Sequence, residues 1–422
     1  MGRSARDRRP QQPRPVQRIQ LPEGDTTKRM IAVVVLIALG VGFLTYGVSQ
    51  LVSRSAGWTQ IEAKTSSEMN CTSEFVLQYD LGKGETSATV EYKRLSALYT
   101  EAATRAYQMY HATELFEGCR NLAYLNQHPN EMVTVDAALY AALEAVVDSG
   151  SRLLFLGPVY EQYDALFGCV YDYEAENFDP LLDADVKAYV DAAAAFAADP
   201  DAVSLELLGD GQVRLNVSEK YLRFAEENET AALLDFFWLK NAFIADDLAQ
   251  ALKEAGYTRG GLSSYDGFSR RLGSGEDYSF NIYDRVGEAT YPAAVMRCGE
   301  ADAIVYLRGY ARNELDTLHY YTYAAGEVRT PYIALRDGLS HAAVNDLTAY
   351  ASDQTCGQIA LALAEIYLAD SLDETALLAL RQRGIDTVYC KDRVILHTDP
   401  AIVLEQLFQN ERITYTQKTI SK

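Results

Sequence analysis

The chain contains one long apolar run, close to its amino terminus. Residues 31–52, from Ile31 to Val52, include no charged side chain. A helix rises about 1.5 Å per residue, so this run would extend roughly 33 Å, which matches the hydrocarbon core of a bilayer. We therefore predict a single transmembrane helix over these residues.

The charges on either side of this run predict its orientation. Residues 1–30 form a basic tail with eight Lys or Arg side chains against three acidic ones. The positive-inside rule then places the amino terminus in the cytoplasm and the rest of the chain outside, as a single-pass protein of the cell membrane. A cleavable signal peptide would have a shorter apolar core and a clear small-x-small site, which Ser53 to Gly57 does not supply. An uncleaved anchor is the expectation, with a cleaved signal peptide and a buried helix of a soluble domain as the alternatives.

Beyond the predicted span, the chain divides into three parts. Residues 53–73 are polar and rich in Ser and Thr, which suits a stalk between the bilayer and a folded domain. Residues 74–405 have the alternation of apolar and polar positions that a folded domain requires. Residues 406–422 are expected to be a polar carboxyl-terminal tail.

The folded part combines helical and strand-like patterns. Asp210-Gly211 joins two short alternating runs, which predicts a β-hairpin. Residues 257–272 contain three glycines and are expected to form a turn-rich connection. Helices are predicted over 90–120, 135–147, 180–200, 233–255 and 356–368, and further strands over 75–79, 278–283, 303–310, 318–323, 341–350 and 387–397. This mixture indicates a single domain of the α+β (mixed α/β) class.

Charge and cysteine spacing exclude several classes of function. Acidic residues outnumber basic ones by 59 to 38, a formal charge of −21, so the surface repels phosphate backbones and nucleic acid is not an expected partner. The spacing of the six cysteines excludes CxxC zinc and thioredoxin-like motifs. Disulfides outside the cell and buried free thiols both stay open for Cys71, Cys119, Cys169, Cys298, Cys356 and Cys390.

Several short segments match the motifs of one family, in the same order. Asn121 to Asn126, followed by Val133 to Asp136, is similar to a turn ending in Leu-Asn before a helix. Phe155 to Tyr160 is similar to an aromatic segment with Gly-Pro. His319 and Gly326 keep the seven-residue spacing of a strand that faces the flavin. In these features residues 75–400 resemble the ApbE-type FAD:protein FMN transferases, a membrane-attached family.

The resemblance implies roles for individual residues. His319 would act as the catalytic base or a flavin contact, and its alternative role is that of a strand histidine packed among tyrosines. Lys240, Arg308 and Arg312 would supply positive charge toward phosphate, unless acids or water neutralise them. The cofactor-binding residues implied by the resemblance are Asn126, Lys240, Asp246, Gly309 and Gly326.

The chain departs from the family where a metal would bind. Family members hold Mg²⁺ with an Asp-x-x-x-Thr pair in an alanine-rich helix, whereas Gly357 and Leu361 occupy those positions here. Neither side chain has an oxygen, and Mg²⁺ requires oxygen ligands. Asn241 also stands where the family has a glycine after the lysine. FAD is therefore the cofactor that the resemblance implies, while bound Mg²⁺ is not supported and no metal ligand is assigned.

No other motif points to chemistry. GxSxG, HExxH and P-loop sequences do not occur. Asp235, Asp246, Asp247 and Asp353 match no known metal-binding loop, so we expect a solvated acidic face.

Two hypotheses of different classes remain. The first is a divergent enzyme that transfers FMN from FAD to a threonine of an acceptor redox protein at the membrane. The second is a catalytically inactive descendant of such an enzyme that acts as a flavin- or protein-binding scaffold.

Overall fold

The computed structural model describes residues 54–64, 70–273, 278–312, 319–410 and 413–421. The predicted basic tail 1–30 and the predicted span 31–52 lie outside these residues. Among the helices that are described, none combines the length and apolar character needed to cross a bilayer. Residues Ser55–Lys422 form one compact unit.

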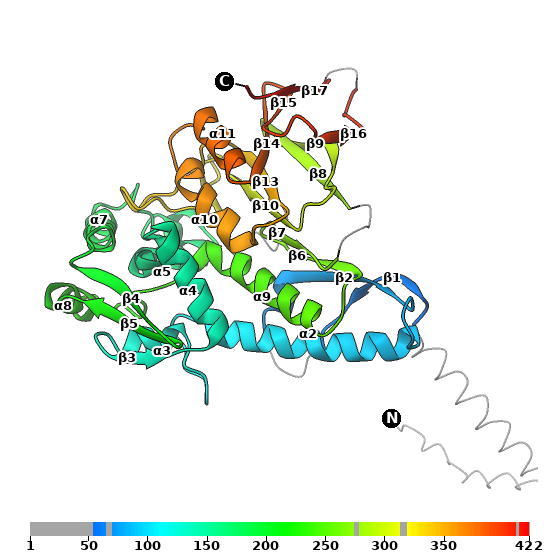
Figure 1. Ribbon diagram of the computed structural model, residues 1–422. Coiled ribbons are helices and arrows are strands. Elements are labelled where there is room, and N and C mark those ends of the chain that lie inside the picture. The colour runs from blue at the N-terminus through cyan, green and yellow to red at the C-terminus, as the bar shows by residue number, and fades with distance from the viewer. Residues whose placement is uncertain (1–53, 65–69, 274–277, 313–318, 411–412, 422) are drawn as a thin grey trace, which may run out of the picture. The chain divides into compact units, whose positions relative to one another are not determined.

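A nine-stranded sheet forms the centre of the unit (Figure 1). Its neighbours pair antiparallel, except for the last two strands, which run parallel. Its strands, in spatial order, are β1 (Gly57–Ile61), β2 (Phe75–Leu81), β6 (Gly260–Ser264), β7 (Phe268–Arg271), β10 (Ala303–Arg308), β13 (Asp346–Ala351), β14 (Asp386–Lys391), β15 (Val394–His397) and β17 (Thr416–Thr419).

Smaller sheets lie beside the main one. They comprise β3 (Met132–Thr134) with β5 (Gln212–Val217) and β4 (Val203–Gly209); β16 (Val403–Glu405) with β9 (Ala289–Arg297) and β8 (Ser279–Val286); and the hairpin of β11 (Tyr321–Thr322) and β12 (Val328–Arg329). The β4–β5 hairpin turns at Asp210-Gly211, as predicted, with positive φ at both residues.

The helices follow local sequence signals closely. Thr355 and Gln358 form a capping box at the start of α10, and Gly150 ends α4 in the left-handed conformation. The helices are α2 (Ala88–Tyr110), α3 (Leu122–Gln127), α4 (Ala137–Ser149), α5 (Gly157–Phe167), α6 (Asp172–Ala175), α7 (Ala184–Ala198), α8 (Glu219–Glu227), α9 (Lys240–Glu254), α10 (Cys356–Tyr367) and α11 (Glu374–Gln382). Together with the sheets they confirm the mixed α+β class.

The structure differs from the sequence-based prediction in several segments. The helix expected over 90–120 ends at Tyr110, and α3, α5, α6, α8 and α11 were not predicted. Three segments expected as connections or tails contain strands. Residues 257–272 contain β6 and β7, two inner strands of the main sheet, instead of a connection. A Cβ at Gly260 would lie 2.3 Å from the carbonyl oxygen of Gln78, so a glycine is required for the strands to approach. The range 53–73, expected as a stalk, contributes strand β1, and the expected tail 406–422 contributes strand β17.

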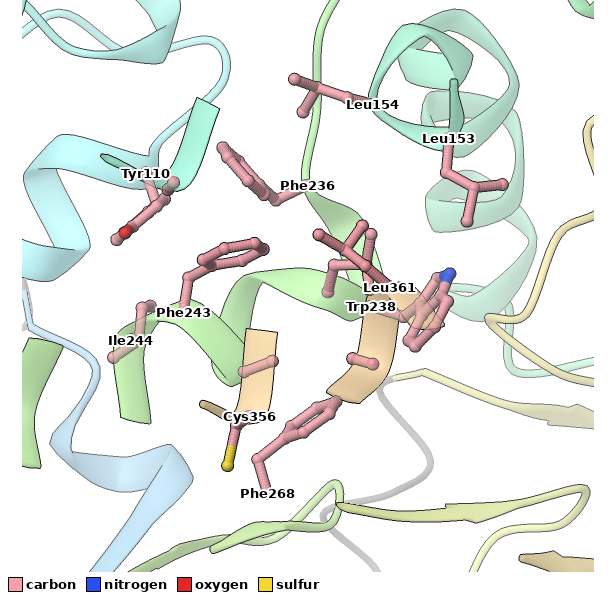
Figure 2. Close-up of a cluster of buried hydrophobic side chains, with 14 of the residues drawn as sticks. Tyr110, Leu153, Leu154, Phe236, Trp238, Phe243, Ile244, Phe268, Cys356 and Leu361 are labelled. Atoms are coloured by element: carbon pink, nitrogen blue, oxygen red, sulfur yellow. The ribbon is translucent and has the colours of Figure 1, made fainter. Parts of the chain in front are cut away.

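A hydrophobic cluster fills the space between α9 and α10 (Figure 2). Phe243 of α9 contacts Phe236, with ring centroids 5.0 Å apart. Leu361 of α10 belongs to the same cluster and is only 7% exposed. Packing of Phe243 thereby fixes the first turn of α9, and the first residue of α9 is Lys240.

All six cysteines are free thiols in the structure. Four of them, Cys71, Cys298, Cys356 and Cys390, are buried. Of the two alternatives for the cysteines, disulfides and free thiols, the structure has free thiols.

Candidate functional site

A cavity of about 160 Å³ brings together two of the residues singled out from the sequence, Lys240 and His319. It lies beside the start of α9. Its other walls come from the residue before β2, the turn between β6 and β7, and the residues that lead into β11. Its lining comprises Glu74, Asp164, Asp235, Phe237, Trp238, Lys240, Asn241, Asp266, Phe268, His319, Tyr320, Pro331 and Tyr332.

The chain enters α9 through a strained turn. Phe237 has φ +47°, a conformation that bulky residues rarely adopt. Its ring stacks on Tyr160 with centroids 4.4 Å apart, and its backbone N–H donates to Asp235 Oδ1 at 2.8 Å. These contacts hold the strained turn in place and set the side chains of residues 235–241 around the cavity.

Lys240 is surrounded by carboxylates. Burial acts to lower the pKa of Lys240, but Glu74, Asp235 and Asp164 outweigh it, so the net shift is upward. Burial, together with the nearby Asp235, raises the pKa of Asp164 to about 6 against the opposing effect of Lys240. Lys240 is therefore a permanent cation, which suits it to hold negative charge in place and not to act as a base.

Asn241 connects two further carboxylates. Its Nδ2 donates to Glu74 Oε2 at 2.8 Å and to Asp266 Oδ2 at 2.9 Å. Both N–H groups are thereby used, while the buried Asn241 Oδ1 and Asp266 Oδ1 have no hydrogen-bond partner among the described residues. The indole Nε1 of Trp238, on the same cavity, is likewise buried without one. Buried polar atoms without partners are uncommon in native folds, and these three belong to residues that line the cavity, although the atoms themselves have almost no accessible surface.

His319 also lines the cavity. It directly precedes Tyr320, which leads into strand β11. The neighbouring tyrosines anchor this segment: Tyr320 Oη donates to the carbonyl of Arg308 at 2.9 Å, and Tyr323 Oη donates to Asp179 Oδ2 at 2.9 Å. Burial raises the pKa of Asp266, and a hydrogen bond with Ser264 and the nearby His319 oppose that shift. His319 and Asp266 line the same cavity, and the role of His319 in catalysis stays a prediction.

The other residues expected to bind a cofactor lie outside the lining of this cavity. Asn126 bonds to the backbone of Ala112 and Leu234. Gly309 donates its N–H to the carbonyl of Asn345, and Gly326 lies in the turn of the β11–β12 hairpin with φ +93°.

The two arginines expected to supply positive charge are also outside the cavity lining. Arg308 Nη2 donates to the carbonyl of Tyr265 at 2.9 Å. The guanidinium of Arg312 lies 3.9 Å from the ring centroid of Tyr283. Of the cations proposed from the sequence, Lys240 is the one that lines the cavity.

The solvated acidic face predicted from the sequence is wrong for three of its four members. Asp235 lines the cavity. Asp246 accepts the backbone N–H groups of Cys356 and Gly357, both at 2.9 Å, and lies 3.3 Å from Arg270 Nε. Asp247 accepts from Tyr110 Oη at 2.8 Å. Asp353 is exposed, as expected. Helix packing draws Asp246 and Asp247 inward, because α9 is covered by α2 on one side and α10 on another.

Asp247 predicts a pH dependence of stability. Burial raises its pKa to about 7, against about 4 in the unfolded chain. Between these values the folded state holds a proton that the unfolded state releases, so stability falls as pH rises through this window. Asp247→Asn cannot ionise, and its stability relative to the wild type should increase by about 2–3 kcal/mol between pH 5 and pH 8.

Urea unfolding at the two pH values measures this difference. Asp148→Asn, at an exposed position of α4, is the matched control and should show no such change. A gap between Asp247→Asn and the wild type that does not vary with pH would mean that Asp247 stays ionised in the fold.

The positions that the resemblance assigns to metal ligands do not fit Mg²⁺. A Cβ at Gly357 would lie 2.6 Å from Cε1 of Phe243, and Leu361 is packed in the hydrophobic cluster (Figure 2). Neither position supplies a side-chain oxygen. Within the described parts of the chain, no group of three or more His, Cys, Asp or Glu side chains is arranged to hold a metal ion.

Sequence reasoning missed Glu74, Trp238, Asn241 and Asp266. The sequence analysis considered Asn241 only because the family has a glycine at that position. A polar side chain next to the lysine that begins a helix was a signal that could have pointed to it. Glu74 and Asp266 are brought to it by pairing of β2 with β6, a contact that the sequence analysis did not predict.

Comparisons with known proteins support the fold. No family model matches the chain, and no curated protein matches it. Its structure is similar to the ApbE protein from Thermotoga maritima, with a TM-score of 0.54 and 13% identity, over 83% of this chain and 97% of that one. It is also similar to Flavin Transferase ApbE from Vibrio cholerae, with a TM-score of 0.52 and 12% identity, over 84% and 99% of the two chains. The expected ApbE-like fold is confirmed, in a divergent form.

Proposed function

Starting from an ApbE-like fold, we propose that this chain is a membrane-anchored, extracytoplasmic binding or scaffolding protein that does not carry out metal-dependent FMN transfer. The observation that carries the proposal is the contact of Gly357 with the ring of Phe243. At the position where the resemblance requires an aspartate, any side chain would have to displace the Phe243 ring.

The chemistry of the transfer explains why this contact matters. Moving FMN from FAD to a threonine hydroxyl is a phosphoryl-type transfer, in which cations neutralise the charge that develops on the phosphate oxygens. The cavity offers Lys240 for that purpose, but four carboxylates line the same space. Those carboxylates disfavour a pyrophosphate by simple repulsion.

The size of the cavity supports the same proposal. Pockets for drug-sized ligands typically measure about 300–1,000 Å³, whereas this cavity measures about 160 Å³. A three-ring flavin with its dinucleotide tail does not fit within it.

One observation favours the other candidate function, an active FMN transferase. Lys240 and His319, which the resemblance assigns to the cofactor and to catalysis, share one cavity. In that case Lys240 would hold the phosphate and His319 would take the proton of the attacking hydroxyl. The two candidates differ in whether FAD binds with a dependence on Mg²⁺ and whether an acceptor gains mass.

The test uses the full chain purified in detergent. Calorimetric titration with FAD, with and without Mg²⁺, is expected to show no metal-dependent binding. Mass spectrometry of an acceptor protein incubated with the chain, FAD and Mg²⁺ is expected to show no added FMN, while the Vibrio cholerae flavin transferase serves as the positive control. Metal-dependent affinity together with an FMN-sized mass gain would overturn the proposal in favour of the enzyme.

The membrane part of the proposal is supported by the apolar run 31–52 and by the basic residues before it. Carbonate extraction of membranes that hold the full chain tests the anchor, because an integral protein stays in the pellet.

A further inference from the structure

One segment of the chain turns several large apolar side chains toward solvent. It runs from Val170 to Leu182, between α5 and α7, and includes the short helix α6; we call it the apolar loop. The exposed fractions are 76% for Val170, 56% for Tyr171, 66% for Tyr173, 37% for Phe178, 52% for Leu181 and 52% for Leu182. Exposed apolar side chains are common singly, whereas a group of them with a polar rim marks an interaction site.

Two carboxylates fix the apolar loop to the β11–β12 hairpin. Asp172 accepts Tyr321 Oη at 2.8 Å and the backbone N–H of Ala324 at 3.0 Å. Asp179 accepts Tyr323 Oη at 2.9 Å. The rings of Tyr321 and Tyr323 have centroids 4.8 Å apart, so the two carboxylates lie close together and the chain between them forms a compact turn.

This anchoring orders the apolar loop although much of its apolar surface is not buried. The rings of Tyr171 and Tyr173 stack on each other, with centroids 5.5 Å apart and an angle of 10° between their planes. A surface that is ordered before a partner arrives loses less conformational entropy on association. The apolar loop is therefore a preformed contact surface.

The charge around the apolar loop is negative. Residues 170–185 include six Asp or Glu side chains and no Lys or Arg. Asp172 and Asp179 bind the hairpin, and the remaining carboxylates are those of Glu174, Glu176, Asp183 and Asp185. A guanidinium group pairs with carboxylates and also stacks on aromatic rings, so arginine matches both components of this surface.

The same charge disfavours two other occupants. A second copy of the chain in a symmetric dimer would place the acidic rim against itself, and like charges across an interface are unfavourable. A bilayer that contains anionic lipids would repel the rim in the same way. The occupant that fits is another protein with basic groups on its contact surface.

We propose that the apolar loop is the docking site for a protein whose contact surface combines apolar side chains with arginines. Tyr171, Tyr173 and Leu181 pack against the apolar centre of that surface, and Glu174 and Glu176 pair with arginines at its rim. This inference deepens the proposed binding function and rests on it, because it names the contact surface and the chemistry of the partner.

The test uses the full chain in phosphatidylcholine nanodiscs and a defined probe. The probe is a fluorescein-labelled amphipathic helical peptide made of leucine and arginine. Fluorescence anisotropy is expected to show saturable binding after subtraction of the signal from empty nanodiscs. A second peptide, with serine in place of every leucine, keeps the charge and is expected to bind at least tenfold more weakly.

Two pairs of substitutions locate the contact. Tyr171→Ser combined with Tyr173→Ser keeps every carboxylate and is expected to weaken binding of the leucine–arginine peptide at least tenfold. Leu181→Ser combined with Leu182→Ser should weaken it several-fold, and provides a second readout if the tyrosine variant does not fold. Met132→Ser, at a position of β3 that is 56% exposed, is the matched control and should leave binding unchanged.

Three results would overturn the inference. Equal affinity of the wild type and the tyrosine variant would mean that the peptide is held by diffuse charge alone. A dimer in sedimentation that the tyrosine variant disrupts would make a second copy the occupant. Flotation with phosphatidylcholine vesicles that depends on the same tyrosines would make it a membrane. None of these measurements involves FMN, so they are distinct from failure of the proposed function, which is detected as FMN on the acceptor protein.

Discussion

Gly357→Asp, which restores the metal ligand that the resemblance requires, is expected to destabilise the fold by about 3–5 kcal/mol. Its Cβ would lie 2.6–3.0 Å from three carbons of the Phe243 ring, closer than packed atoms approach. Its carboxylate would then enter the hydrophobic cluster between α9 and α10. An acidic residue in the first turn of a helix normally gains about 0.3–1 kcal/mol from the helix dipole, which is too little to offset these costs. Urea unfolding measures the difference.

Two further variants serve as controls for this prediction. Gly357→Ala adds the Cβ without the charge and is expected to cost less than Gly357→Asp. Combined with Phe243→Ala, Gly357→Asp should be less costly than the sum of the two single changes, by at least about 1 kcal/mol, because the ring that causes the clash is gone. If Gly357→Asp were as stable as the wild type, packing would not explain why this position lacks the metal-binding aspartate that the resemblance requires.

Elements specified by neighbouring residues could be predicted from the sequence. The capping box of Thr355 and Gln358, the helix stop at Gly150 and the Asp210-Gly211 turn each depend on residues within one turn of chain. The sequence analysis placed α10, α4 and the β4–β5 hairpin close to their observed bounds.

The inner strands β6 and β7 could not be predicted in the same way. Gly260 is needed because a Cβ there would meet the backbone of Gln78, almost two hundred positions earlier in the chain. A glycine that permits close strand packing looks the same in the sequence as one that makes a turn.

The candidate site shows the same limit. Lys240 and His319 were found through the resemblance, and the structure places both on one cavity. Asn241 is separated by 167 positions from Glu74 and by 25 from Asp266, yet it donates to both. Only the pairing of β2 with β6 brings these carboxylates together, so no local pattern marks them.

Arg329→Met is the second change with a large expected effect, about 3–5 kcal/mol of lost stability. Arg329 Nε donates to Asp179 Oδ2 at 2.7 Å, and the side chains are 8% and 0% exposed. Asp179 also accepts from Tyr323 Oη and from the backbone N–H of Leu181. Without the arginine, these neutral donors would have to hold a fully buried charge by themselves.

A matched pair and an exposed pair test this explanation by urea unfolding. Asp179→Asn combined with Arg329→Met removes both charges, and should recover most of the stability that Arg329→Met loses. Lys187→Met breaks the exposed pair of Lys187 with Asp191 and should cost less than about 0.5 kcal/mol. If the double variant were no more stable than Arg329→Met, the loss would come from packing of the arginine stem and not from the buried charge.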